Sequence, residues 1–420
     1  MLPKKNLFYE WNHEGQPGTA LLKREIQVND ETLRDGIQAS GIKYPTFEEK
    51  IEIINLMVAL GIDSACIGFP ASGSAMMEDL EGIIHHIQAN GLHLNIACAA
   101  RTVEADIAPI VQLSQKFGIS IDANIFVGSS PIRQYVEGWD KSYIVRLVKE
   151  ALTFAGRHNL PICFITEDTT RSRPDDLREI YLTGIEYGAY RICLCDTVGY
   201  AEPEGVVRLV SYMKSILNEE KVDKDILLDW HGHNDRGLAL ANALTALAAG
   251  VDRVHATGLG IGERAGNTSM EQLLVNLKLS GLKETDLLKL KAYCLAVSRG
   301  CGVQIPFNLP IMGAKVFTTA SGVHAAAILK AKKKNNLFLA DRVYSGVPAA
   351  ELGFEQEIDI GPLSGKSNFS YLLEKHNIHN EELLEEIYAK NRSSRTSLSI
   401  SEIDQILKKH AGKEVKVDND

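Results

Sequence analysis

The sequence lacks any long hydrophobic run. No stretch approaches the roughly 18 uninterrupted apolar residues that a membrane-spanning helix needs. Residues 1–20 carry charged and polar side chains where a secretory signal would need an apolar segment. We therefore expect a cytoplasmic protein with no membrane partner.

An excess of basic charge is also missing. The 420 residues include 45 lysines and arginines against 54 aspartates and glutamates, which gives a net charge of −9. Such a chain has no broad basic face to displace counterions from a phosphate backbone, so nucleic acid is not expected as a partner. Hydrophobic residues at 45% are ordinary for a globular protein and exclude the disordered class.

Cysteine is scarce and odd in number. Most of the cysteines lie in apolar, strand-like runs, which suits reduced thiols packed in a core better than a disulfide framework. Cys193 and Cys195 could form half of a zinc site, but no second pair with ligand spacing exists. We therefore expect seven free cysteines: Cys66, Cys98, Cys163, Cys193, Cys195, Cys294 and Cys301.

What the sequence does contain is a repeated strand-and-helix unit. Eight apolar or β-branched runs recur, at 25–33, 64–69, 93–99, 119–127, 161–165, 191–194, 226–230 and 253–256. Amphipathic stretches with helical spacing lie between them, for example at 47–60, 103–117, 144–155, 206–217 and 238–249. An open doubly wound sheet is the rival fold. Eight units in about 250 residues favour an α/β protein built on a (β/α)8 TIM barrel.

The rhythm breaks after residue 280. Helical patterns follow at 287–298, 321–333, 381–390 and 400–410, and Pro306 and Pro310 punctuate the connection between the first two. We expect small mixed α/β subdomains after the barrel. The expected division is an N-terminal extension (1–24), the catalytic barrel (25–300), a linker subdomain (301–350) and a small C-terminal subdomain (351–420).

Polar residues follow nearly every predicted strand. In a TIM barrel the carboxyl ends of the strands meet at one face, where active sites lie. These residues should therefore converge on one site, which is stronger evidence than any single motif. They are Arg34, Asp35, Arg101, Asn124, Glu167, Asp168, Asp196, Thr197, and the segments 231–235 and 263–267.

Two histidines in this ring have metal-ligand spacing. His231 and His233 are two residues apart on a strand, so both imidazoles point to the same side. Asp35 supplies a negative charge that two neutral imidazoles lack, and a divalent metal site is expected. Asp229 and Asp235 share the face of the histidines and are alternative ligands or supporting partners.

Other interpretations of these residues stay open. His231 and His233 could be hydrogen-bonded strand-end histidines, and two histidines with a carboxylate also describe the facial triad of iron(II) oxygenases. The glycine-rich segment 258–262 precedes a helix expected near Thr268, where barrels often bind phosphate, although a plain turn is an equal alternative. A lysine cluster at 330–334 is best explained as solvent-exposed, with a grip on an acidic cofactor as the alternative.

Three motifs together carry a family resemblance. Residues 31–38 have the sequence ETLRDGIQ, residues 231–235 HGHND and residues 262–267 GERAGN, in this order and at the ends of predicted strands. The chain resembles the acyl-CoA-condensing barrel enzymes, namely the 2-isopropylmalate, homocitrate and citramalate synthases, over residues 24–368. Aldol-cleaving relatives carry a cysteine in the loop after the eighth strand. The segment 258–267 has none, which argues for condensation.

The resemblance implies a divalent metal ion, with zinc first and manganese or magnesium as alternatives. Its ligands would be Asp35, His231 and His233, and the side-chain oxygen of Asn267 would be an additional one. The ion would chelate the keto oxygen and carboxylate of a 2-oxo acid. The residues expected to bind that acid are Arg34, beside the keto oxygen, Thr197, at the carboxylate, Gln38, Arg101 and Asn124.

The resemblance also implies acetyl-CoA as co-substrate, whose methyl group must lose a proton to a positioned base. Glu167 matches the glutamate that the family carries on its fifth strand. His324 and Tyr344 match a histidine and a tyrosine from the subdomain beyond the barrel. With Arg34, these three residues form the expected catalytic set. In the family this subdomain covers a neighbour's barrel mouth, which implies a homodimer.

The identity of the oxo acid depends on finer features. The segment 68–70 resembles the isopropylmalate branch, and Phe126 suits a branched aliphatic acid, so the expected reaction is condensation of acetyl-CoA with 3-methyl-2-oxobutanoate in leucine biosynthesis. Homocitrate and citramalate synthase are the alternatives, with Arg101 and Arg133 as cations for a second carboxylate. A catalytically silent barrel is the more distant one. Asn124 and Ile37 depart from the family pattern, and the tail after Asn368 is expected to lack a full regulatory domain.

Overall fold

The computed structural model describes residues 24–220, 222 and 225–393, together with short pieces at 7, 9, 11–12, 402–403 and 405–406. It divides into two units, Met1–Gln304 and Ile305–Asp420, and each is described by itself. Nearly all of the expected N-terminal extension, and most of the helix expected at 400–410, lie outside the described residues.

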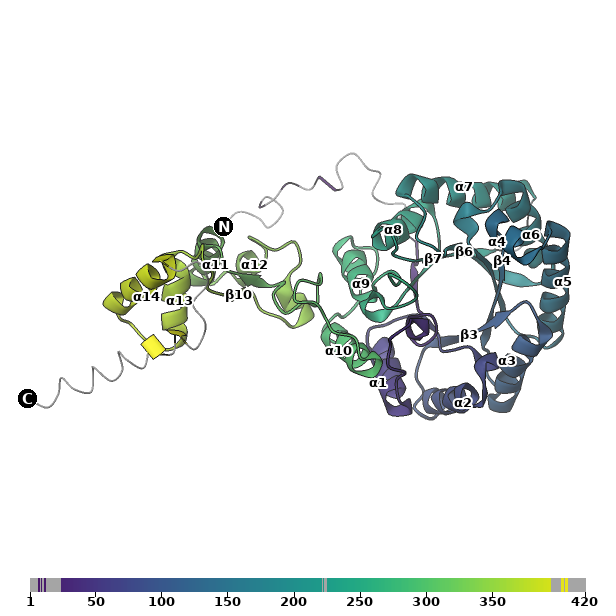
Figure 1. The fold of residues 1–420 in the computed structure, drawn as a ribbon, viewed down its shortest axis with the longest axis horizontal. Coiled ribbons are helices and arrows are strands. Elements are labelled where there is room, and N and C mark those ends of the chain that lie inside the picture. The colour runs from purple at the N-terminus through teal and green to yellow at the C-terminus, as the bar shows by residue number, and fades with distance from the viewer. Residues whose placement is uncertain are drawn as a thin grey trace, which may run out of the picture. The chain divides into compact units, whose positions relative to one another are not determined.

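Eight parallel strands of the first unit close into a barrel (Figure 1). Each strand pairs with the next along the chain, and β1 pairs with β8 from Gln27 opposite Arg253 to Asp30 opposite Ala256. The predicted TIM barrel is confirmed, and the open sheet is excluded. The strands are β1 (Gln27–Asp30), β2 (Ser64–Cys66), β3 (Asn95–Arg101), β4 (Asp122–Gly128), β5 (Ile162–Glu167), β6 (Ala189–Asp196), β7 (Leu227–Gly232) and β8 (Arg253–Ala256).

Helices surround these strands in a ring (Figure 1). Local sequence explains where several of them begin: Thr46 and Glu49 form a capping box at the start of α1, and Pro203 occupies the first turn of α7. The helices are α1 (Phe47–Ala59), α2 (Ser74–Ala89), α3 (Glu104–Phe117), α4 (Pro131–Glu137), α5 (Lys141–Arg157), α6 (Pro174–Glu186), α7 (Pro203–Glu219), α8 (Ala239–Ala249), α9 (Met270–Leu279) and α10 (Leu290–Cys301).

Apolar side chains fill the layer between strands and helices. Outward-facing Phe164 of β5 contacts α6 so closely that a Cβ on Gly184 would lie 2.5 Å from its ring. The predicted cysteine chemistry is also confirmed, since all seven cysteines are free and buried. Cys193 and Cys195 lie 3.8 Å apart at Sγ and belong to a buried cluster with Cys163.

The second unit is small and mixed in structure. Its helices are α11 (Gly322–Lys333), α12 (Leu337–Ala340), α13 (Lys366–Lys375) and α14 (Glu381–Ser393), and a two-stranded parallel sheet joins β9 (Thr318–Thr319) to β10 (Glu357–Ile358). Phe369, Leu373, Leu383 and Ile387 form its apolar core together with Ile403 and Ile406. The expected segments 301–350 and 351–420 both belong to this unit except for residues 301–304, which belong to the first unit.

Across the residues that the structure describes, no helix has the length and hydropathy that a bilayer crossing requires.

Candidate metal centre

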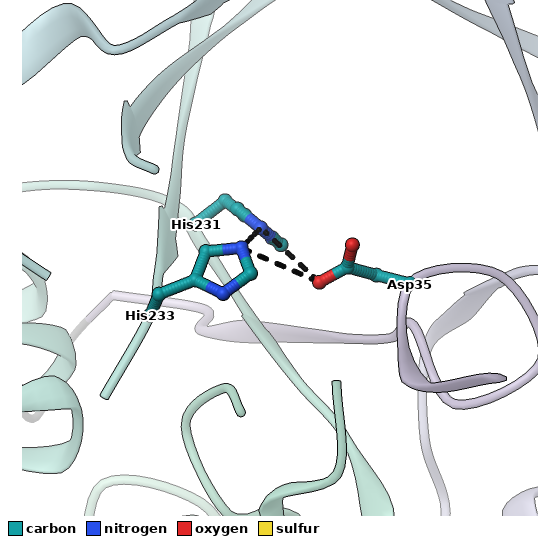
Figure 2. A group of neighbouring side chains, drawn as sticks. All are labelled: Asp35, His231 and His233. Atoms are coloured by element: carbon teal, nitrogen blue, oxygen red, sulfur yellow. Dashed lines mark hydrogen bonds and ion pairs between the residues drawn. The ribbon is translucent and has the colours of Figure 1, made fainter. Parts of the chain in front are cut away.

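Asp35, His231 and His233 converge at the carboxyl ends of the strands (Figure 2). Asp35 lies in the turn after β1, His231 is in β7, and His233 follows it. The Nε2 atoms of the two histidines are 3.3 Å apart. Their distances to Oδ2 of Asp35 are 3.8 Å for His231 and 3.4 Å for His233. The three residues can therefore turn one ligand atom each toward a common point.

The electrostatics of this cluster suit a cation. Burial lowers the pKa values of both His231 and His233, so the imidazoles are neutral at ordinary pH and keep a lone pair for a ligand. Burial alone would raise the pKa of Asp35, but the adjacent Arg34 guanidinium, together with smaller contributions from His231, His233 and Asn267, outweighs it and keeps the carboxylate ionised. Two neutral imidazoles and one carboxylate form a donor set that divalent metals such as zinc accept.

Buried polar atoms without a partner also lie around the cluster, although the histidine atoms among them are Nδ1 and not the Nε2 atoms that face Asp35. Nδ1 of His231, Nδ1 of His233 and Oδ1 of Asn267 are buried without a hydrogen-bond partner in the described part of the chain. Asn267 donates from Nδ2 to Oδ2 of Asp35 at 2.6 Å and to the carbonyl of Ile261 at 3.1 Å. Asn267 therefore adjoins the cluster, and its predicted role as an oxygen ligand stays a prediction.

Glycines shape the loop that brings Asn267 to the cluster. Gly262 has a φ of +148°, and a Cβ there would lie 2.1 Å from Nδ2 of Asn267. A Cβ on Gly266 would lie 1.9 Å from the carbonyl oxygen of Gly260. The GERAGN motif thus needs glycine at both positions because side chains there would displace Asn267.

A buried network fixes Arg34 and Asp35. Arg34 donates from Nε to Oε2 of Glu31 at 2.7 Å and from Nη1 to Oδ1 of Asp35 at 3.1 Å. Nδ1 of His255 lies 3.3 Å from the other oxygen of Glu31, and its Nε2 lies 3.0 Å from Oδ2 of Asp229. These contacts orient the guanidinium beside the candidate ligands.

The alternative ligands Asp229 and Asp235 are otherwise engaged. Asp229 is fully buried and accepts hydrogen bonds from the guanidiniums of Arg191 and Arg253. Asp235 accepts from Nε of Arg264 at 2.8 Å. Neither carboxylate is part of the group that could hold a metal ion, which within the described ranges consists of Asp35, His231 and His233.

A cavity of about 380 Å³ opens beside the cluster. Its polar lining brings together most of the residues expected at the site: Arg34, Asp35, Gln38, Asn124, Glu167, Thr197, His231 and His233. Its apolar lining includes Phe126 and Ile165. Four further lining residues were not predicted for the site, although alternation along their strands places them at inward-facing positions: Ile165, His255, Cys193 and Cys195.

Three polar groups of the cavity have free hydrogen-bonding capacity. The Thr197 hydroxyl accepts from the backbone N–H of Asp168 at 2.8 Å, which leaves its own proton to donate. Oδ1 of Asn124 is buried without a partner among the residues described. Burial raises the pKa of Glu167, and its carboxylate lies 4.0 Å from Nε of Arg133.

Arg101 lies outside this cavity. Its side chain is 63% exposed and donates from Nε to Asp106 at 2.6 Å and from Nη2 at 2.9 Å. Arg101 follows Ala99 on the inward face of β3, but Asp106 in the first turn of α3 binds it at the rim. The structure therefore does not bring Arg101 together with the other expected substrate-binding residues.

His324 and Tyr344 belong to the second unit. Their rings stack with centroids 3.8 Å apart and planes 24° apart, and both side chains are exposed. His324 lies in the first turn of α11. The pair is thus preformed, while its approach to a barrel mouth stays a prediction.

Comparison with known proteins places this site in a family. The HMGL-like family model matches residues 25–295. A 2-isopropylmalate synthase of Pyrococcus furiosus is 32% identical over 407 residues, which cover 93% of this chain and 77% of that protein. Homocitrate synthase AksA of Methanopyrus kandleri is 29% identical over 397 residues, covering 92% of this chain and 93% of that protein.

Solved structures agree on the fold. The hydroxymethylglutaryl-CoA lyase of Pseudomonas aeruginosa matches with a TM-score of 0.55 at 19% identity, over 66% of this chain and 94% of that one. The family model and the 2-isopropylmalate synthases carry the assignment to a family. The chain belongs to the HMGL-like family and, within it, to the 2-isopropylmalate synthase family.

Proposed function

We propose that the chain condenses acetyl-CoA with 3-methyl-2-oxobutanoate and hydrolyses the thioester, giving 2-isopropylmalate and CoA. The observation that carries this proposal is the convergence of Asp35, His231 and His233 beside Arg34 in one cavity. A 2-oxo acid offers a keto oxygen and a carboxylate, which suit a site built for a divalent cation next to a guanidinium. The printed names of the relatives support the same chemistry.

Asp35, His231 and His233 would hold the metal, with Asn267 as an additional ligand. When bound, a divalent ion such as zinc, manganese or magnesium supplies Lewis acidity to the keto group of the substrate. The fit rests on Nε2 of both histidines and Oδ2 of Asp35, which face one another at 3.3 to 3.8 Å.

Arg34 would stabilise the negative charge that develops on the keto oxygen during carbon–carbon bond formation. It is suited to this role because Glu31 and Asp35 fix its guanidinium before substrate arrives. The Thr197 hydroxyl would donate to the substrate carboxylate, and Gln38 and Asn124 would contact the acid from the cavity wall. Phe126 and Ile165 would pack against the branched alkyl group.

The co-substrate half of the reaction needs a base. A methyl proton of acetyl-CoA passes to a base in the group formed by Glu167, His324 and Tyr344, and the resulting carbon nucleophile attacks the keto carbon. The new alkoxide takes up a proton. Water then attacks the thioester carbonyl, and CoA leaves as its thiol. The raised pKa of Glu167 brings this carboxyl closer to the pH at which it can exchange protons.

The family resemblance supports a site built from two chains. We propose a homodimer in which His324 and Tyr344 of each chain serve the barrel of its neighbour. Chains carrying Asp35→Asn and chains carrying His324→Ala should each be inactive, and mixed subunits should recover thiol release, because some mixed dimers contain one intact site. Failure to recover after subunit exchange, verified by two affinity tags on one complex, would contradict shared sites.

A second substrate has one observation in its favour. Nε of Arg133 lies 4.0 Å from Glu167, which lines the cavity, and is buried without a hydrogen-bond partner in the described chain, while Nη1 pairs with Glu137 at 3.0 Å. This guanidinium could bind the distal carboxylate of 2-oxoglutarate, which would make the chain a homocitrate synthase. Arg133→Leu separates the two readings, since it should lower turnover of 2-oxoglutarate alone.

The test is thiol release from acetyl-CoA with 3-methyl-2-oxobutanoate, pyruvate and 2-oxoglutarate in parallel, each with and without a chelator. Chelator-sensitive release that is fastest with 3-methyl-2-oxobutanoate supports the proposal. Preference for another acid keeps the mechanism and changes the substrate. No release from metal-loaded protein with any of the three acids overturns the proposal and favours a lyase or a silent barrel.

A further inference from the structure

A second cavity, of about 500 Å³, lies at the amino ends of the strands. Its lining includes the first residues of several strands, among them Gln27 of β1, Ser64 of β2, Asp122 of β4 and Arg253 of β8. Because the strands are parallel, this end of the barrel is opposite to the one that holds Asp35 and the two histidines. The cavity is therefore separate from the candidate active site, and its size falls within the usual range for small-molecule sites.

Two buried arginines form one wall of this cavity. Arg191 and Arg253 are each 3% exposed, and both donate to the single carboxylate of Asp229. Arg191 also donates to Gln27 at 2.9 Å, and Arg253 to Ser64 at 3.1 Å.

These partners do not use all the hydrogen-bond donors of the two arginines. Each guanidinium has five N–H donors, and Nε of Arg191 has no hydrogen-bond partner among the residues described. Asp229 also accepts from His255 at 3.0 Å, so three donor side chains share one carboxylate. The wall thus offers more donors and more positive charge than Asp229 can satisfy.

The other walls suggest what kind of anion fits. Two further carboxylates line the cavity, and both have partners: Asp122 accepts a hydrogen bond from the Tyr190 hydroxyl at 2.6 Å, and Asp63 pairs with Lys283 at 2.9 Å. Ile87, Ile96 and Ile119 contribute apolar surface. A ligand with one planar anionic group and an aliphatic body would satisfy both kinds of wall, since guanidinium matches a carboxylate in a bidentate manner.

We propose that this cavity is a binding site for a small aliphatic carboxylate, whose anionic group pairs with Arg191 and Arg253 and whose alkyl group lies against Ile87 and Ile96. An occupant would touch the same ion-pair network that runs from Arg253 through Asp229, His255, Glu31 and Arg34 to Asp35. This site is distinct from the one that would take the 2-oxo acid.

The test uses the full-length, metal-loaded protein and isothermal titration with 4-methylpentanoate, which has no 2-oxo group. Ser120 is exposed and lines the cavity outside the ion-pair network, so Ser120→Trp should fill the space without breaking an ion pair. We expect wild-type protein to bind and Ser120→Trp to bind at least about tenfold more weakly. Ser280→Trp, at an exposed serine outside the cavity lining, is the matched control and should bind as wild type does.

A second variant and a neutral probe keep the test independent of one substitution. Arg191→Gln leaves Asp229 paired with Arg253 and His255, and it should weaken binding to a similar extent. 4-Methylpentanamide, which lacks the charge, should bind more weakly than the acid. The proposal is overturned if wild-type protein does not bind 4-methylpentanoate. It is also overturned if folded Ser120→Trp and Arg191→Gln, verified by circular dichroism, bind it as tightly as wild type.

Discussion

The two ends of the barrel carry buried polar groups of opposite character. At the carboxyl ends, Asp35, His231 and His233 present acceptor atoms to one point, so the missing partner is a cation. At the amino ends, Arg191 and Arg253 present spare N–H donors around one carboxylate, so the missing partner is an anion. Unsatisfied buried groups are costly, and the sign of what is missing indicates what each end can bind.

A network of ion pairs, in which acidic and basic side chains alternate, joins the two ends of the barrel. It runs from Arg253 to Asp229, His255, Glu31, Arg34 and Asp35, with closest contacts between neighbours of 2.6 to 3.3 Å. Every interior member holds two neighbours. Substitutions at either end of this network, or in its middle, therefore test the contrast between the two ends of the barrel.

The largest effect is expected at the carboxyl end. His233→Ala removes one of three converging ligands, so metal bound per chain should fall close to zero by atomic emission. Thiol release should then drop more than about 100-fold, because even loss of a supporting partner costs about 10- to 100-fold. Arg101→Ala, which removes a rim arginine outside the cavity, is the control and should retain both metal and turnover. Full metal occupancy in His233→Ala would exclude this histidine as a ligand.

At the amino end the expected effect is on stability. Asp229→Asn leaves Arg191, Arg253 and His255 buried around a neutral amide. Removing one partner of a buried ion pair typically costs about 3–5 kcal/mol, and urea unfolding should show a loss of that order. Glu204→Gln, in an exposed pair with Arg208, should change the free energy of unfolding by less than about 1 kcal/mol. Equal small losses in both variants would show that the network contributes no stability.

A substitution in the middle of the ion-pair network should have an intermediate effect. Glu31→Gln keeps the volume but removes the charge that holds Arg34 and His255. Arg34 then loses its main anchor beside Asp35, and metal affinity should fall by about 10- to 100-fold, as for other partners of metal ligands. Competition with a chromogenic chelator measures this affinity. An affinity within error of wild type would mean that Asp35 is oriented without help from the network.

The site at the carboxyl ends of the strands could be predicted from the sequence, whereas the buried arginines at the amino ends could not, for a physical reason. The eight repeated units and the polar residues after the strands were enough to predict the barrel, and the spacing of His231 and His233 added the convergence of the candidate ligands. Arg191, Arg253 and His255 lie inside strands, where a charged residue is usually assigned to solvent. Their burial becomes evident only when β7 and β8 pair and bring Asp229 opposite Arg253.

Arg101 illustrates the converse limit of the sequence pattern. It is a polar residue at a strand end, as the rule requires, but Asp106 binds its guanidinium and its backbone N–H at the rim. Whether the Arg101 side chain points into the cavity or toward the first turn of α3 depends on the geometry of the loop after β3. Neither composition nor periodicity predicts this loop geometry. Arg101 was therefore predicted for the site because it is a polar residue at a strand end, although its side chain binds Asp106.

The smallest expected effect is on the pH dependence of stability, to which His233 and His255 should contribute with opposite sign. Burial lowers the pKa of His233, so in metal-free protein this histidine destabilises the fold progressively as pH falls below the value of an unfolded histidine, about 6.5. Burial would also lower the pKa of His255, but hydrogen bonds to Asp229 and Glu31 outweigh it and raise that pKa. The stability from His255 is therefore complete at low pH and is lost as pH rises through its folded pKa.

Urea unfolding of metal-free protein between about pH 5 and pH 8 tests this opposition. Relative to wild type, His255→Gln should lose most stability at the acidic end, because the charged imidazole makes its full contribution there. His233→Gln should compare best with wild type at the same acidic end, because it no longer has to take up a proton in a buried site. Parallel pH profiles for the two variants would mean that the two histidines experience the same environment, and the contrast between the ends of the barrel would then fail.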